Sequence, residues 1–299
     1  MSLAVYTDPD LRNTRVMVVG AGTMGRQIAM TAALAGFPTI LQDISAEGLA
    51  AAEHDLAHWA KGRVDKQKLR EEDASAALGR IEYAGDLSAA ARADVVIEAA
   101  TERLDIKRDI FAELGRICPP HTILVTNSST LGSSKIARES GRPDKVCNMH
   151  FFNPALVMKC VEVVRHEATS QQTVEAVMAL ARAFGKEPVL INREIPGFIA
   201  NRLMGAIQRE AMALAEAGVA TREDIDATAR TALGHPMGPF ALMDMVGLDV
   251  IHFMAECTYA ETGDPADRPS TAVAALVEEG RLGRKSGAGF YEYGPAAAG

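Results

Sequence analysis

Short apolar runs alternate with helix-like stretches over the first two thirds of the 299-residue chain. Several runs are continuously apolar, which is typical of parallel strands covered on both faces. The strand-like runs are 15–19, 38–42, 94–98, 122–126, 145–149, 160–164 and 187–191. Among the intervening stretches, 170–184 has helical periodicity, with Ser170 as a capping residue and Gly185 as a stop. The alternation predicts an α/β fold with a doubly wound parallel sheet.

The stretch from about residue 46 to 78 interrupts this alternation. It is long, polar and helix-favouring, so it predicts a helical insertion, such as a hairpin, in place of one short crossover helix. Five cations fall within ten residues of it: Lys61, Arg63, Lys66, Lys68 and Arg70. They indicate either a clamp for the phosphates of an anionic substrate or a solvated helix face.

The pattern changes after residue 191. A linker-like segment, 192–197, is followed by sequence in which strand signals almost vanish. The stretches that look helical are 198–217, 221–233, a segment after Pro239, and 270–279. We therefore expect two domains, residues 1–194 and an all-α domain over 195–299, with the substrate bound in the cleft between them.

Composition narrows the class of protein. A net charge of −8 argues against a general nucleic-acid binder. No apolar run approaches the roughly 20 residues of a membrane helix, and the first residues lack the pattern of an export signal. The four cysteines have neither CxxC nor zinc spacing, and His54 and His58 lack a third ligand nearby. We expect a cytoplasmic protein without a metal, a nucleic-acid partner or a membrane partner.

A glycine-rich turn directly follows the first strand-like run. In Gly20-x-Gly22-x-x-Gly25, the first glycine permits a tight turn, the second lets the backbone approach a pyrophosphate, and the third lets a helix pack closely. Asp43, 18 residues beyond Gly25, is placed to bind a ribose 2′-hydroxyl and to repel a 2′-phosphate. The sequence therefore predicts NAD rather than NADP. The turn residues expected at the cofactor are Gly20, Gly22, Thr23, Met24 and Gly25.

A histidine and a glutamate are the best candidates for proton transfer. His150 ends a strand-like run, at the sheet edge where such folds bind ligands. Glu162 lies inside an apolar run, where an unpaired carboxylate is costly. A His–Glu pair would explain that carboxylate and would orient the imidazole as a general base. Two alternatives stay open, a hydrogen-bonded core histidine and an ion pair of Glu162 with Lys159.

Further motifs follow in one order along the chain. They are Asn-Ser-Ser at 127–129, His-Phe-Phe-Asn-Pro at 150–154, Pro-Gly-Phe-Ile-Ala-Asn-Arg at 196–202, His-Pro-Met-Gly-Pro-Phe at 235–240 and Gly-Arg-Lys-Ser-Gly at 283–287. With these motifs the chain resembles the 3-hydroxyacyl-CoA dehydrogenases over nearly its whole length. It is most similar to the short, stand-alone 3-hydroxybutyryl-CoA dehydrogenases.

The resemblance implies a Rossmann-type domain with a C-terminal all-α domain that forms a homodimer. It also implies NAD-dependent oxidation of a (3S)-3-hydroxyacyl-CoA to the 3-ketoacyl-CoA, and the reverse reduction. His150 would be the general base, Glu162 its partner, and Ser129 and Asn201 would bind the reacting oxygen. Positions that match cofactor-lining residues of the family are Glu102, Lys107, Ser129, Asn153 and Lys285. Cations expected near the CoA nucleotide are Lys61, Arg63, Lys66 and Lys68.

Two other functions stay open. One is a dehydrogenase of a hydroxy acid without CoA, such as L-gulonate or carnitine, which would not need the cationic clamp. The other is a non-catalytic NAD-binding protein like the related lens crystallins, although such a protein would be free to lose at least one catalytic candidate. Ala155-Leu156 stands where the family usually has Val-Pro, which could alter the preference for acyl-chain length.

Overall fold

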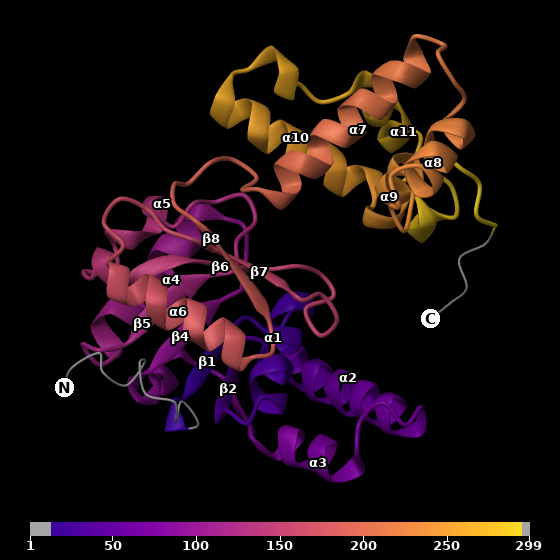
Figure 1. The fold of residues 1–299 in the computed structure, drawn as a ribbon. Helices are drawn as coiled ribbons and strands as arrows, with labels where there is room; N and C mark the ends of the chain where they lie inside the picture. The colour runs from indigo at the N-terminus through magenta and orange to yellow at the C-terminus, as the bar shows by residue number, and fades with distance from the viewer. Residues whose placement is uncertain (1–12, 295–299) are drawn as a thin grey trace. The chain divides into compact units, whose positions relative to one another are not determined.

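The computed structural model describes residues 13–294. The chain divides into two compact units, with the boundary between Ile195 and Pro196. Figure 1 shows the elements of both units, which are described separately below. Among residues 13–294, no helix combines the length and the apolar character needed to cross a membrane.

The first unit is built on one eight-stranded sheet with the order β3-β2-β1-β4-β5-β6-β7-β8. The strands are β1 (Val16–Val19), β2 (Thr39–Gln42), β3 (Ile81–Ala84), β4 (Val95–Glu98), β5 (Ile123–Thr126), β6 (Val146–Phe151), β7 (Cys160–Val164) and β8 (Glu187–Ile191). All seven strand-like runs of the sequence form strands, and the α/β class is confirmed. The sequence missed β3, because this edge strand buries only Ile81 and has no continuous apolar run.

One pair of strands departs from the parallel arrangement. β1 to β6 are parallel, but β7 runs antiparallel to β6, and β8 is parallel to β7. Only residues 152–159 connect β6 to β7. Parallel strands need a crossover of a dozen or more residues, so this short connection forces a hairpin.

Helices cover both faces of the sheet, as Figure 1 shows. One face packs on α1 (Thr23–Leu34) and α6 (Gln171–Ala183), and alternate residues of β6 and β7 join this core. The other face packs on α4 (Leu104–Ile117), on α5 (Ser134–Ala137) and on the 3₁₀ helix η3 (Leu87–Arg92). The parallel strands are thus buried on both sides, which explains their continuous apolar sequence.

The stretch from 46 to 78 forms two helices, α2 (Ala46–Asp65) and α3 (Glu71–Gly79). The hydroxyl of Ser45 caps α2 by accepting a hydrogen bond from the Gly48 N–H at 2.9 Å. The two helices lie against each other and against α1 (Figure 1). Three residues spaced by four, Ala52, Leu56 and Ala60, form the buried side of α2.

The second unit is helical. Its helices are α7 (Ala200–Glu216), α8 (Arg222–Thr231), α9 (Pro239–Val246), α10 (Leu248–Thr262) and α11 (Thr271–Glu278). Buried Asp226 accepts hydrogen bonds from the N–H groups of Phe240 (2.8 Å) and Ala241 (2.9 Å) and so caps α9. Gly238 permits this contact, because a Cβ atom there would lie 2.2 Å from the Asp226 carboxyl carbon.

Candidate functional site

The glycine turn follows β1 and lies against the backbone of Ala99 and Ala100, which follow the neighbouring strand β4. Gly20 has φ of +101°, and a Cβ atom there would lie 2.6 Å from Cα of Ala100. A Cβ atom on Gly25 would lie 1.8 Å from the carbonyl oxygen of Gly20, so α1 can begin this close to the turn only with glycine. A Cβ atom on Gly22 would meet nothing within 4 Å. The turn therefore leaves open space at the start of a helix, as a bound pyrophosphate requires.

Asp43 follows β2 and lies against this turn. Its Oδ2 accepts a hydrogen bond from the Ala21 N–H at 2.7 Å, and its Oδ1 accepts one from the Ser45 N–H at 2.9 Å. The carboxylate thus joins the glycine turn to the start of α2. Each oxygen keeps a further lone pair for the hydroxyls of a ribose. The sequence predicted a carboxylate at this place but not its hydrogen bonds to the turn.

His150 and Glu162 lie directly opposite each other on the antiparallel strands β6 and β7. Nδ1 of His150 is 2.9 Å from Oε2 of Glu162, and the residues are 5% and 2% exposed. A carboxylate that accepts from Nδ1–H favours the tautomer in which Nε2 holds the lone pair, as a base requires. The alternative pairing of Glu162 with Lys159 is wrong, because Lys159 pairs with Glu187 on the surface, at 3.8 Å.

The serine loop, residues 127–133 between β5 and α5, carries the two serines of the Asn-Ser-Ser motif. The Ser128 hydroxyl donates to the carboxylate of Glu102 and accepts a hydrogen bond from the Leu131 N–H at 3.0 Å. The half-buried Ser129 hydroxyl has no hydrogen-bond partner among residues 13–294. Of the two serines, Ser129 is therefore the one whose hydroxyl can be offered to a ligand. The loop reaches β6 through Asn127, which accepts a hydrogen bond from the Phe151 N–H at 2.9 Å.

A buried ion pair supports the same loop. Nζ of Lys107, on α4, is 2.6 Å from Oε2 of Glu98 and 3.3 Å from Oγ1 of Thr126. Lys107 is 1% exposed and Glu98 is completely buried. The structure thus places Lys107 inside the protein as an ion-pair partner and not on an open surface, in contrast to the exposed Glu102 and Asn153. The sequence analysis overlooked Glu98, although a glutamate that ends an apolar strand requires a partner.

Two site candidates belong to the second unit. Asn201 is the second residue of α7 and is half-buried. Nζ of Lys285, on the 3₁₀ helix η6 (Arg284–Ser286), is 2.6 Å from Oδ1 of Asp249. Among residues 13–294, no cluster of three or more His, Cys, Asp or Glu side chains could hold a metal ion.

The basic stretch lies at the end of α2 and in its connection to α3. Lys61 pairs with Asp65 at 2.8 Å, and the Arg63 guanidinium carbon lies 5.7 Å from the centre of the Trp59 ring. Within the described residues, the ammonium groups of Lys66 and Lys68 have no hydrogen-bond or ion-pair partner.

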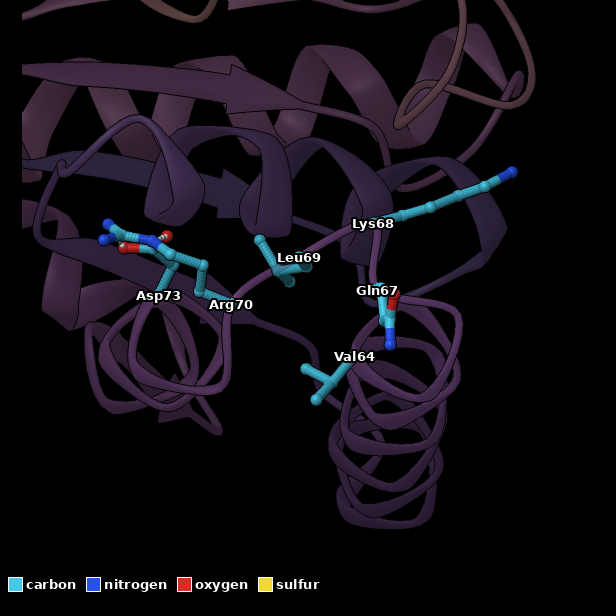
Figure 2. A pocket seen from close by; sticks show the side chains of 6 residues that line it. All are labelled: Val64, Gln67, Lys68, Leu69, Arg70 and Asp73. Atoms are coloured by element: carbon cyan, nitrogen blue, oxygen red, sulfur yellow. Dashed lines mark hydrogen bonds and ion pairs between the residues drawn. The ribbon is translucent and has the colours of Figure 1, made fainter.

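A pocket of about 460 Å³ lies beside these cations (Figure 2). Its lining residues are Val64, Gln67, Lys68, Leu69, Arg70 and Asp73. Arg70 and Asp73 face each other as an ion pair of 2.6 Å, whereas the Lys68 side chain extends away from them (Figure 2). The stretch therefore offers both cations that are already paired and cations that a phosphate could bind.

Comparisons with known proteins agree over nearly the whole described chain. Residues 15–195 match the family model "3-hydroxyacyl-CoA dehydrogenase, NAD binding domain", and residues 197–293 match "3-hydroxyacyl-CoA dehydrogenase, C-terminal domain". The chain is 42% identical to a probable 3-hydroxybutyryl-CoA dehydrogenase of Bacillus subtilis, over 93% of this chain and 97% of that protein. It is 38% identical to the human mitochondrial hydroxyacyl-coenzyme A dehydrogenase, over 93% of this chain and 90% of that protein.

Solved structures give the same result. The (S)-3-hydroxybutyryl-CoA dehydrogenase of Ralstonia eutropha matches with a TM-score of 0.90 and 37% identity, over 95% of this chain and all of that one. A diketoreductase that acts on dicarbonyl compounds matches with a TM-score of 0.83 and 35% identity, over 94% and 99% of the two chains.

Proposed function

The chain belongs to the 3-hydroxyacyl-CoA dehydrogenase family and is an NAD-dependent oxidoreductase, and from this premise we propose its substrate and its catalytic residues. The substrate is a (3S)-3-hydroxyacyl-CoA, above all 3-hydroxybutyryl-CoA, which is oxidised to the 3-ketoacyl-CoA in a reversible reaction. The observation that carries the assignment of the base is the buried pair of His150 on β6 and Glu162 on β7, whose Nδ1 and Oε2 atoms are 2.9 Å apart.

The proposed mechanism uses a base and a pair of donors. Nε2 of His150 removes the proton of the 3-hydroxyl group while Glu162 holds the ring through Nδ1. Ser129 and Asn201 bind the same oxygen as its charge changes during the reaction. Bound NAD⁺ supplies the acceptor for the hydride that leaves C3. In the reverse direction, His150 returns the proton to the oxygen of the 3-ketoacyl group.

The cofactor site follows from the glycine turn. The open space at Gly22 and the carboxylate of Asp43 beside the turn support a site for the pyrophosphate and the adenine ribose. The residues proposed to contact NAD are Gly20, Gly22, Thr23, Met24, Gly25, Asp43, Glu102, Ser129, Asn153 and Lys285. Lys107 is proposed to act through its ion pair with Glu98, because its ammonium group is buried.

The basic stretch is proposed to bind the phosphates of CoA. Lys66 and Lys68 are the best candidates, because no described carboxylate neutralises them. Arg63 is a further candidate, whereas Lys61 would first have to leave Asp65. A cationic clamp would favour a thioester of CoA over a free hydroxy acid.

We also propose a homodimer that forms through the second unit, and a cytoplasmic location. The support for the dimer is a set of exposed apolar side chains on α7, α9 and α10. They are Leu203, Ile207, Met245, Val250 and Phe253. A contiguous patch of exposed apolar side chains often marks a protein interface.

Steady-state assays of NADH oxidation test the substrate. Acetoacetyl-CoA is compared with free acetoacetate, with dehydro-L-gulonate and with a series of 3-ketoacyl-CoA thioesters from C4 to C16. We expect turnover of the thioesters, with kcat/KM highest for the C4 compound. Turnover of the free acids alone would instead support the second candidate, a dehydrogenase or reductase without CoA. The specific observation in favour of that candidate is the similarity to the diketoreductase.

A further inference from the structure

An asparagine next to the proposed base lies inside the sheet. Asn148 is on β6, two residues before His150, so both side chains project from the same face. Asn148 is completely buried. An amide that is removed from water costs free energy unless it is hydrogen-bonded, so its contacts need an explanation.

The Asn148 side chain makes three hydrogen bonds, all to the backbone of the serine loop. Oδ1 accepts from the Ser133 N–H at 2.8 Å, and Nδ2 donates to the carbonyl oxygens of Ser128 (3.2 Å) and Leu131 (3.0 Å). An N–H can only donate and a carbonyl can only accept, so these partners also fix the orientation of the amide. One side chain therefore fastens the loop at its start, middle and end.

Ser129 lies between the two carbonyl groups that Asn148 holds. Its own hydroxyl has no partner among the described residues, so the position of that hydroxyl depends on the backbone around it. The far end of the loop has a second anchor, because the hydroxyl of Ser133 and the N–H of Ser134 both donate to Oε1 of Glu194 (2.8 and 2.9 Å).

We propose that Asn148 is a positioning residue, which holds the Ser129 hydroxyl at a fixed place relative to the His150 ring. Both groups must reach the same substrate oxygen. The strand β6 positions both of them, because it carries His150 itself and also carries Asn148, which holds the backbone around Ser129. A displacement of about 1 Å at a reacting group can cost about 100-fold in rate. The inference rests on the proposed function, in which Ser129 binds the reacting oxygen.

Asn148→Leu tests the proposal, because it removes all three hydrogen bonds and keeps a side chain of similar length. Asn148→Ser is a milder second variant for the case that the leucine variant does not fold. Thr122→Val is the matched control. Thr122 is equally buried and donates to the Ala93 carbonyl oxygen at 2.7 Å, just before the opposite end of β5.

The readouts are kcat and KM for acetoacetyl-CoA, NADH affinity by fluorescence, and the melting temperature. We expect Asn148→Leu to lower kcat by about 30- to 100-fold. NADH affinity should fall less than kcat, by under about tenfold, because Ser129 is only one of the ten residues proposed to contact NAD. Asn148→Ser should lower kcat less, and Thr122→Val should leave it within threefold. In a Ser129→Ala background, Asn148→Leu should lower kcat by less than threefold, because the hydroxyl that Asn148 positions is already absent.

Three results would overturn the inference. One is a kcat within threefold of wild type for folded Asn148→Leu or, if only the serine variant folds, for Asn148→Ser. Another is an undiminished effect of the Asn148 change in the Ser129→Ala background, which would indicate a general structural role. The third is a normal kcat for Ser129→Ala itself, which would also remove Ser129 from the mechanism. Failure of the proposed substrate is seen separately, because wild-type protein would then not reduce acetoacetyl-CoA.

Discussion

Alanine at Gly22 and alanine at Gly25 should have different effects, although the two glycines are only three residues apart. Gly22 has φ of −63°, which alanine adopts readily, and its Cβ would meet no atom within 4 Å. At Gly25, the Cβ would lie 1.8 Å from the carbonyl oxygen of Gly20, which is backbone and cannot rotate away. Gly22→Ala should therefore affect ligand binding, and Gly25→Ala should affect folding.

The magnitudes follow from these contacts. Gly22→Ala replaces a favourable N-cap residue, which costs at most about 1 kcal/mol, or about 4 °C in melting temperature. Its methyl group stands where the pyrophosphate would approach, and losing one charged hydrogen bond of about 1.5–3 kcal/mol weakens NADH binding about 10- to 150-fold. Gly25→Ala must push α1 from the turn, at a cost of about 3 kcal/mol and about 6–12 °C.

The assay is NADH fluorescence titration together with thermal unfolding, each with and without NADH. Gly79→Ala is the control, because Gly79 ends α3 and a Cβ there also meets no atom within 4 Å. It should leave NADH affinity unchanged and raise the melting temperature by up to about 4 °C, because alanine is favoured over glycine in a helix by up to about 1 kcal/mol. NADH affinity of Gly22→Ala within twofold of wild type would refute the placement of the pyrophosphate at this turn.

Three further changes test the site and its support. Glu162→Gln should lower kcat at least about tenfold, since a charged hydrogen bond is worth about 1.5–3 kcal/mol. Glu187→Gln is its control and should leave kcat unchanged, because Glu187 belongs to an exposed ion pair of 3.8 Å. Lys107→Met leaves the Glu98 carboxylate buried without its cation, which should lower the free energy of unfolding by about 3–5 kcal/mol. The melting temperature should therefore fall by at least about 6 °C, and a second change, Glu98→Gln, should partly restore it. Burial lowers the pKa of His166 more than the nearby Glu194 carboxylate raises it. His166 is therefore harder to protonate in the folded state than in the unfolded state. Its contribution to the free energy of unfolding is fully present above about pH 6.5, the pKa in the unfolded state, and is lost as the pH falls below that value. His166→Gln should flatten this fall between about pH 7 and 5 in thermal unfolding, and an unchanged slope would contradict the assignment.

The fold could be predicted where burial leaves a strong pattern. Parallel strands with two covered faces are continuously apolar, so seven of the eight strands stand out in the sequence. The edge strand β3 does not, because three of its four residues are not buried. The first helix of the second unit begins at Ala200 rather than at Phe198, because Phe198 has φ of +51°, which a right-handed helix excludes.

The site was predictable only in part. A glutamate within an apolar strand signals a partner, and this argument found Glu162. The same argument applies to Glu98 and to Asn148, but their partners come from α4 and from a loop backbone, which no spacing in the sequence indicates. The reversal at β7 was readable in principle, because the connection over 152–159 is too short for a crossover.

The hairpin of β6 and β7 makes the proposed catalytic pair a local contact of the chain. His150 and Glu162 are 12 positions apart, whereas the contact of Arg15 with Asp94, which ties β1 to β4, spans 79 positions. The entropy of loop closure makes the shorter contact cheaper by about 1.7 kcal/mol. The base and its partner can therefore meet early in folding, before the helical crossovers have brought the parallel strands together.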